Sequence, residues 1–127
     1  MIVVDTSVWG AALRGREDSP AETLTSLLDA DEVALALPVR VELSAGIART
    51  GRAALKSGLT ALPVVVPTEA TWELVEEWGV RSADAGQRFA MADLLIAALA
   101  DEIGALVWSL DADFNRLSGL GFVRLYG

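Results

Sequence analysis

The amino-acid sequence predicts an α/β fold built around a parallel β-sheet. Short apolar runs typical of buried strands recur along the chain, and segments with helical spacing of apolar residues lie between them. Such alternation is expected when parallel strands are joined by right-handed helical crossovers. The chain has 127 residues and is 53% hydrophobic, so we expect a single domain, residues 1–127, with a core of its own.

The expected strands are short and apolar. The first, residues 2–4, ends at Asp5, and the fourth, residues 105–108, is followed by Asp111 and Asp113. The remaining strands are expected at residues 33–37, 63–66 and 122–125. Because sites in such sheets form beyond the carboxyl ends of the strands, the acids after the first and fourth strands should meet at one edge.

The expected helices fill the intervals between these strands. Thr6 or Ser7 can cap the first of them, over residues 8–13. The others are expected at residues 19–29, from residue 38, and at residues 53–62, 68–83 and 91–103. Their expected core positions include Val41, Leu43 and Ile47, then Trp72, Val75 and Trp78, and finally Leu94, Leu95, Ala98, Leu99 and Ile103.

The composition removes most catalytic side chains from consideration. The chain has no cysteine, which excludes disulfides, a thiolate nucleophile and Cys-ligated zinc. It also has no histidine, which excludes the usual general base, the serine triad, a paired-histidine nuclease mechanism and His-based zinc sites. Carboxylates are left to do the chemistry, with hydroxyls and arginines to assist.

The amino terminus reads Met-Ile-Val-Val-Asp and lacks a basic segment followed by an apolar stretch, so no signal peptide is expected. No apolar run approaches the ~20 residues that a membrane span needs. We therefore expect a cytoplasmic protein with no membrane association.

The net charge of −8 argues against a broad basic surface for nucleic acid but leaves room for a local one. Four basic residues fall within one short region, namely Arg40, Arg49, Arg52 and Lys56. They are candidates for RNA binding, and a solvated helix face is an equally good interpretation.

Five acids are the candidate functional residues: Asp5, Glu42, Asp93, Asp111 and Asp113. Each also has an ordinary structural explanation, as a helix cap, a first-turn partner of the helix dipole, or part of an acidic turn. Gathered at one sheet edge, they would repel each other. A hard divalent cation such as Mg²⁺ or Mn²⁺ resolves that repulsion, and such a site suits hydrolysis of phosphodiesters.

Four motifs together resemble the PIN domain, and most of all the compact VapC-type toxin ribonucleases of type II toxin–antitoxin systems. They are Met-Ile-Val-Val-Asp-Thr-Ser at residues 1–7, Val-Glu-Leu-Ser-Ala-Gly at 41–46, Ala-Asp-Leu-Leu-Ile-Ala-Ala at 92–98 and Ser-Leu-Asp-Ala-Asp-Phe at 109–114. The resemblance covers nearly the whole chain, and the order and spacing of the motifs are specific in combination. It implies a three-layer fold with a central parallel β-sheet flanked by helices.

The resemblance also implies an activity, that of an Mg²⁺- or Mn²⁺-dependent endoribonuclease. The acids matching the family's catalytic and metal-binding set are Asp5, Glu42, Asp93 and Asp111, with Asp113 a ligand in some members. Thr6 or Ser7 supplies an assisting hydroxyl, and Ser109 stands where the family more often has threonine. A homodimer and a VapB-like antitoxin that blocks the acidic groove are further implications.

Other functional classes fit less well. A receiver-type phosphoryl-transfer protein needs a lysine beside its acids, whereas the single lysine, Lys56, lies in a helical region. A phosphatase with an aspartate nucleophile has its Asp-x-Asp pair after the first strand rather than a late one. A housekeeping RNA-processing nuclease and a non-catalytic PIN-fold binding module stay open. The minimal length of the chain favours a toxin over a housekeeping enzyme.

Overall fold

The structure is a computed structural model that describes residues 1–15 and 19–127. Its centre is a sheet of four parallel strands in the order β3-β2-β1-β4. The strands are β1 (Ile2–Val4), β2 (Val33–Ala36), β3 (Val64–Val65) and β4 (Leu106–Trp108). Ile2 pairs with Val33 on one side and with Leu106 on the other, which places β1 in the interior of the sheet. The predicted α/β class with a parallel sheet is confirmed.

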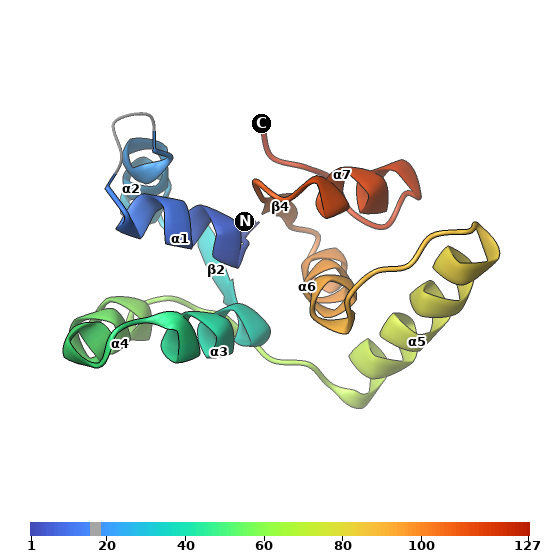
Figure 1. The fold of residues 1–127 in the computed structure, drawn as a ribbon, viewed down its shortest axis with the longest axis horizontal. Helices are drawn as coiled ribbons and strands as arrows, with labels where there is room; N and C mark the ends of the chain where they lie inside the picture. The colour runs from blue at the N-terminus through green and yellow to red at the C-terminus, as the bar shows by residue number, and fades with distance from the viewer. Residues whose placement is uncertain (16–18) are drawn as a thin grey trace.

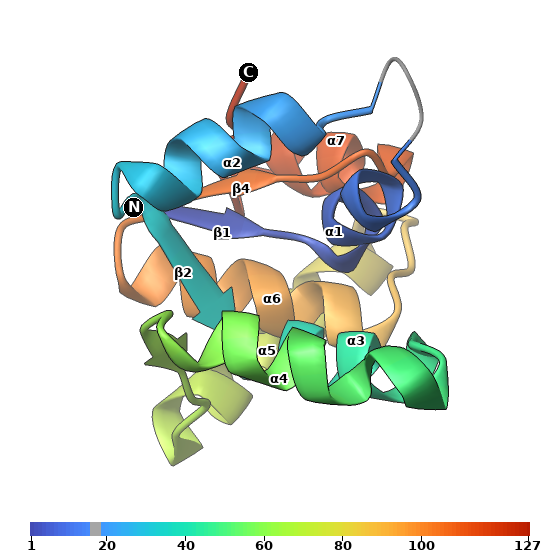
Figure 2. The same ribbon diagram turned by 90° about the vertical axis from the view of Figure 1, so that its left-hand side faces the viewer.

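Helices cover both faces of this sheet. In chain order they are α1 (Thr6–Leu13), α2 (Ala21–Asp29), α3 (Leu37–Gly46), a 3-10 turn (Arg49–Gly51), α4 (Arg52–Thr60), α5 (Glu69–Asp84), α6 (Met91–Glu102) and α7 (Ala112–Gly119). Figure 1 shows the elements in chain order, and Figure 2 shows the sheet between α2 on one side and α6 on the other. The fold therefore has the three layers that the sequence indicated.

The helix α6 lies at the centre of the core. All seven residues from 94 to 100 are buried, so this helix is apolar on every side over two turns. It packs against β1, β2 and β4 on one side and against α5 on the other. Because a helix covered all round must lack polar side chains, its sequence reads as a nearly continuous apolar run. Asp93 stands just before that run, where the helix emerges from the core.

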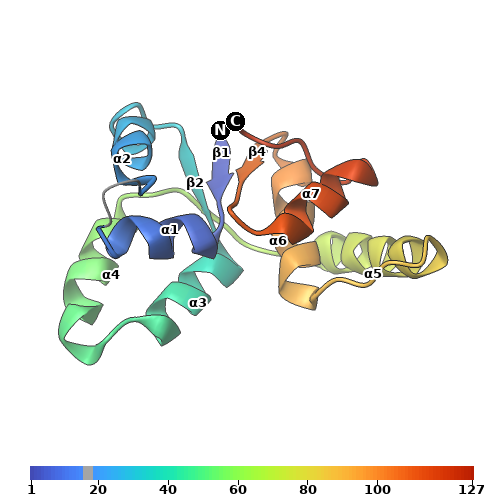
Figure 3. The same cartoon turned by 45° about the horizontal axis from the view of Figure 1, so that its top comes forward.

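The carboxyl ends of the strands lead directly into the helices that carry the acids. Asp5 follows β1 and is the N-cap of α1, while α3 begins as soon as β2 ends. Figure 3 shows α1 and α3 beginning near one another beyond the sheet, and the two helices are in contact. Asp111 follows β4 and caps α7. The parallel arrangement thus delivers separate segments to one edge of the sheet.

Several sequence-based expectations differ from the structure in detail. The N-cap of α1 is Asp5 and not Thr6 or Ser7, because the helix begins two residues earlier than expected. Residues 122–125 form no regular strand; a single parallel bridge joins Leu125 to Val107. This segment begins just after the turn that ends α7 and contributes buried Phe122 and Val123 to the core instead.

Two helix faces are rotated from those expected. In α3, Val41 is 58% exposed and Val39 is buried, because the helix begins at residue 37 and turns residues 39 and 43 inward. In α5, Trp72 is 45% exposed, whereas the neighbouring Thr71 is buried. The hydroxyl of Thr71 accounts for its place, since it belongs to a capping box with Thr68 and donates to Glu102. Ile103, beyond the end of α6, is also exposed.

Candidate functional site

Three of the five candidate acids converge closely. A carboxylate oxygen from each of Asp93, Asp111 and Asp113 lies within 4.8 Å of those of the other two. Asp93 sits in the first turn of α6, Asp111 caps α7, and Asp113 lies in the first turn of α7. Two helix starts, one after α5 and the other after β4, therefore bring their carboxylates together.

Asp5 is the buried member of the acidic site, with 6% of its surface exposed. Its Oδ2 atom accepts hydrogen bonds from the Ser7 hydroxyl at 2.8 Å and from the Ser109 hydroxyl at 2.7 Å. Two hydroxyl donors compensate for the loss of water around a buried carboxylate. Neither hydroxyl contacts the Oδ1 atom of Asp5.

The same two hydroxyls fix the loop between β4 and α7. The Leu110 amide donates to Ser7 Oγ at 3.0 Å, and the Asp111 amide donates to Ser109 Oγ at 2.9 Å. The carboxylate of Asp111 then accepts from the Asp113 amide at 2.9 Å, as an N-cap does. The position of Asp111 is thereby tied to that of Asp5, although the two residues are 106 positions apart in the sequence.

Glu42 reaches the site from α3 and is exposed. The hydroxyl of Thr6, at the start of α1, donates to its Oε1 atom at 3.2 Å. This contact joins α1 to α3 across the carboxyl edge of the sheet. All three predicted supporting hydroxyls, those of Thr6, Ser7 and Ser109, thus lie within hydrogen-bonding distance of a predicted acid.

The electrostatics of the site show that its charges oppose one another. The pKa of Asp93 is raised from 3.8 to about 6, first by partial burial and then by the negative charges of Asp5, Asp111, Asp113 and Glu42, in that order of size. Asp5 and Glu42 therefore belong to the same electrostatic site as the three convergent acids. A set of carboxylate oxygens under mutual repulsion is the donor set that Mg²⁺ or Mn²⁺ prefers, so these residues fit such an ion.

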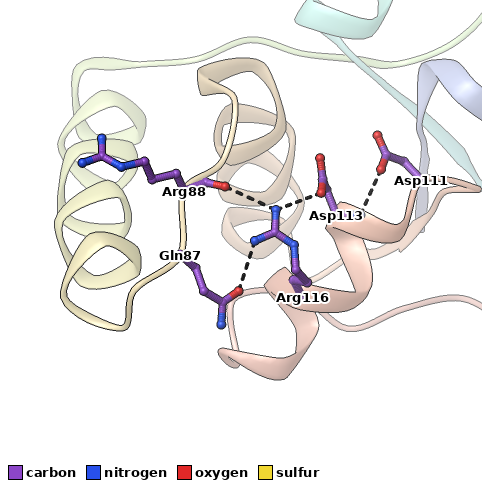
Figure 4. Close-up of polar contacts among 5 residues, drawn as sticks. All are labelled: Gln87, Arg88, Asp111, Asp113 and Arg116. Atoms are coloured by element: carbon purple, nitrogen blue, oxygen red, sulfur yellow. Dashed lines mark hydrogen bonds and ion pairs between the residues drawn. The ribbon is translucent and has the colours of Figure 1, made fainter.

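Sequence analysis did not single out Arg116, which the structure places beside the acids. Its Nη2 atom forms an ion pair with Asp113 Oδ1 at 2.8 Å (Figure 4). The spacing of three residues between Asp113 and Arg116 on one helix was the available signal, since such residues are neighbours on a helix surface.

The four basic candidates lie over α3, α4 and the turn between them. Three of them, Arg40, Arg52 and Lys56, line a groove of about 570 Å³, while Arg49 lies outside that lining. A second groove of about 410 Å³ runs along the other side of α4 and is lined almost entirely by apolar atoms. Its lining is Trp9, Leu13, Leu28, Ile47, Gly51, Ala54, Leu55, Gly58 and Leu59.

The fold and the site together define an α/β protein with a cluster of carboxylates at the carboxyl edge of a four-stranded parallel sheet. The family model for the PIN domain matches residues 2–120, and the chain belongs to the PIN domain family. Among curated protein sequences, none shows significant similarity to it.

Solved structures with the same fold include several toxin–antitoxin proteins. VapBC2 from Rickettsia felis, bound to a DNA fragment from its promoter, has a TM-score of 0.80 at 20% identity over 99% of this chain and 98% of that chain. VapBC-1 from nontypeable Haemophilus influenzae has a TM-score of 0.76 at 19% identity over 99% and 97%. VapC20 from Mycobacterium tuberculosis, a Sarcin–Ricin loop cleaving toxin, has a TM-score of 0.68 at 26% identity over 98% of each chain.

Among the residues that the structure describes, no helix combines the length and the apolar character needed to cross a bilayer.

Proposed function

We propose that this chain is a metal-dependent endoribonuclease that acts as the toxin of a toxin–antitoxin pair. The observation that carries the proposal is the convergence of Asp93, Asp111 and Asp113 in a PIN-domain chain. The similarity to VapC20, a toxin that cleaves the Sarcin–Ricin loop, supports RNA as the substrate class. In this proposal residues 1–127 form one catalytic domain.

In this proposal the acids bind the metal ion and the nearby hydroxyls orient the acids. Asp5, Glu42, Asp93 and Asp111 would hold Mg²⁺ or Mn²⁺, with Asp113 as a further ligand. The bound ion would activate water and neutralise charge on the phosphate during hydrolysis. Ser7 and Ser109 fix the Asp5 carboxylate through its Oδ2 atom, and Thr6 holds Glu42. These hydroxyls orient the acids without touching the substrate themselves, as outer-shell partners of metal sites do.

The test of the nuclease proposal is RNA cleavage by the purified protein. We expect cleavage in the presence of Mg²⁺ or Mn²⁺ and its loss when a chelator is added, because the acids alone supply neither an activated water nor positive charge. Adding the metal back in excess should restore cleavage, which controls for damage by the chelator. Full activity in chelator would rule out the metal mechanism.

The basic residues around α3 and α4 are the proposed contacts to RNA. A protein with a net charge of −8 needs local positive charge to hold a polyanion, and the groove of Arg40, Arg52 and Lys56 provides it. Arg49, on the adjoining turn, would add a contact at the edge of this groove.

We expect the paired change Arg52→Gln and Lys56→Gln to weaken RNA binding and to flatten its salt dependence. Each lost phosphate contact should reduce the slope of log affinity against log salt by about 0.7 for single-stranded RNA. The measurement is RNA affinity between low and moderate salt in chelator, where no cleavage occurs. The control pair, Arg81→Gln and Arg124→Gln, removes the same charge outside this groove. Equal slopes for the two pairs would show that the groove does not contact RNA.

The apolar groove beside α4 is the proposed contact for an antitoxin. Leu13 is 57% exposed at this groove, and the buried Nε1 atom of Trp9 has no hydrogen-bond partner within residues 1–15 and 19–127. An amphipathic segment of a VapB-like partner would cover the apolar surface and supply an acceptor. Trp78, by contrast, stacks on Phe122 inside the core and is not part of this surface. A homodimer of the chain remains part of the proposal.

A further inference from the structure

Arg116 is held beside the acidic site by groups from two parts of the chain. Its Nη2 atom donates to Asp113 Oδ1 at 2.8 Å and to the backbone oxygen of Arg88 at 3.2 Å, and its Nη1 atom donates to Gln87 Oε1 at 3.4 Å. The guanidinium carbon also lies 4.3 Å from the centre of the Phe89 ring. Figure 4 shows Arg116 between the Asp113 side chain and the segment of Gln87 and Arg88.

Three of these four contacts do not involve an acid. The Gln87 amide, the Arg88 carbonyl and the Phe89 ring are uncharged, and all belong to the segment between α5 and α6. These neutral contacts hold the guanidinium in addition to its ion pair with Asp113. This distinguishes Arg116 from an ordinary surface pair on a helix, in which the opposite charge is the main partner.

Asp111 and Asp93, in turn, make contacts that do not involve Arg116, whereas the Asp113 carboxylate is paired with it. Asp111 is fixed by its amide contact to Ser109 and by its cap contact to the Asp113 amide. Asp93 is fixed by the backbone of α6, since its amide donates to the Ala90 carbonyl at 3.1 Å. The contribution of Arg116 to Asp93 and Asp111 is therefore its positive charge, while it also holds the carboxylate of Asp113 in place.

We propose that Arg116 is a fixed internal counter-charge of the acidic site, which stabilises the site without metal and weakens its affinity for divalent cations. It is a positioning and tuning residue and not a catalytic one. The inference rests on the proposed function in that the acids bind metal. A cation that enters the site is repelled by the positive charge of Arg116, which offsets part of its attraction to the carboxylates.

The test is a calorimetric titration of the purified protein with Mn²⁺ alone. It is done at low salt, where charge effects are least screened. Arg116→Gln should bind Mn²⁺ about three- to tenfold more tightly than the wild-type protein, a modest change because Arg116 is partly exposed. Arg116→Met should do the same, since it also removes the charge but keeps an apolar stem against Phe89. Arg116→Lys, which keeps the charge, should remain within about twofold of wild type.

The matched control is Arg124→Gln. Arg124 donates to the Gly104 carbonyl, which precedes β4, whereas the acids follow β4, so its loss should leave Mn²⁺ affinity unchanged. In chelator, Arg116→Gln should melt below Arg124→Gln, and saturating Mn²⁺ should remove the difference. Weaker or unchanged Mn²⁺ binding by both neutral variants would overturn the counter-charge. Absence of Mn²⁺ binding by the wild-type protein would instead overturn the proposed metal centre.

Discussion

Replacing Asp5 by asparagine is expected to reduce RNA cleavage by more than about a hundredfold, beyond the 10–100-fold that loss of an outer-shell partner of a metal usually costs. The variant should still fold, because an asparagine carbonyl can accept the hydroxyl contacts that Ser7 and Ser109 now make to Asp5 Oδ2. What it lacks is the negative charge of the carboxylate and its second acceptor oxygen, which an NH2 group replaces. Cleavage of RNA by purified protein measures the loss.

The same variant tests the toxin role. Wild-type protein expressed without a partner should arrest bacterial growth, and Asp5→Asn should not. The exposed acid Asp29 at the end of α2 provides the control, because Asp29→Asn removes equal charge away from the site and should still arrest growth. Harmless expression of a wild-type protein that cleaves RNA in the test tube would favour an RNA-processing nuclease. Full cleavage by Asp5→Asn would remove Asp5 from the metal site.

Asp93→Asn is expected to melt at a higher temperature than wild type in chelator at neutral pH, although it should be catalytically dead. The raised pKa of Asp93, about 6, means that ionising this residue costs free energy in the folded state. After a discount for solvent screening, that cost is about 1–2 kcal/mol. Loss of the favourable helix-dipole contact offsets about 0.3–1 kcal/mol of the gain. The net stabilisation should therefore raise the melting temperature by roughly 2–6 °C.

The pH dependence follows from the direction of the shift. Between the unfolded pKa near 3.8 and the folded pKa of about 6, the unfolded chain binds fewer protons at Asp93, so wild-type stability falls as pH rises through this range. Below it, Asp93 is protonated in both states and the advantage of Asp93→Asn should disappear. Above it, the advantage should be constant.

Metal should reverse the ranking of the two proteins. At a hundredfold excess of Mg²⁺ over its dissociation constant, wild type gains about 2.7 kcal/mol, more than the variant's advantage. The control is Glu22→Gln, a first-turn acid of α2 outside the acidic site, whose melting temperature should rise with metal as much as that of wild type. If Asp93→Asn is less stable than wild type in chelator and metal shifts both proteins equally, Asp93 is only a helix-start residue.

The sequence was sufficient to predict β1, β2 and β4 and to place Asp5 and Asp111 just beyond their carboxyl ends, because both follow local rules. Buried parallel strands must be apolar, so β1, β2 and β4 stood out as runs, and an acid directly after such a run lies at the carboxyl edge. Helix faces were less predictable. Val41 and Val39 are chemically alike, and which of them is buried depends on the residue at which α3 begins.

The rest of the site depends on contacts between segments that are distant in sequence. Ser109 was expected to assist, but its hydrogen bond to Asp5 needs β1 and β4 to be neighbours. The position of Arg116 depends on contacts with the segment between α5 and α6. This segment is distant from Arg116 in sequence and lies beside it only in the folded protein. Similarly, the groove of Arg40, Arg52 and Lys56 exists because α4 folds back along α3.

The wide spacing of the acids along the chain has a consequence for translation. Asp5 is synthesised well before Asp111 and Asp113, which follow β4, and β4 must pair with β1 before the acids can meet. A nascent chain that has not passed Asp113 therefore has no complete site, however well its earlier segments have folded. If the proposed function holds, a ribosome making this protein would not meet its nuclease activity until β4 and α7 have emerged, and truncation before β4 should yield an inactive product.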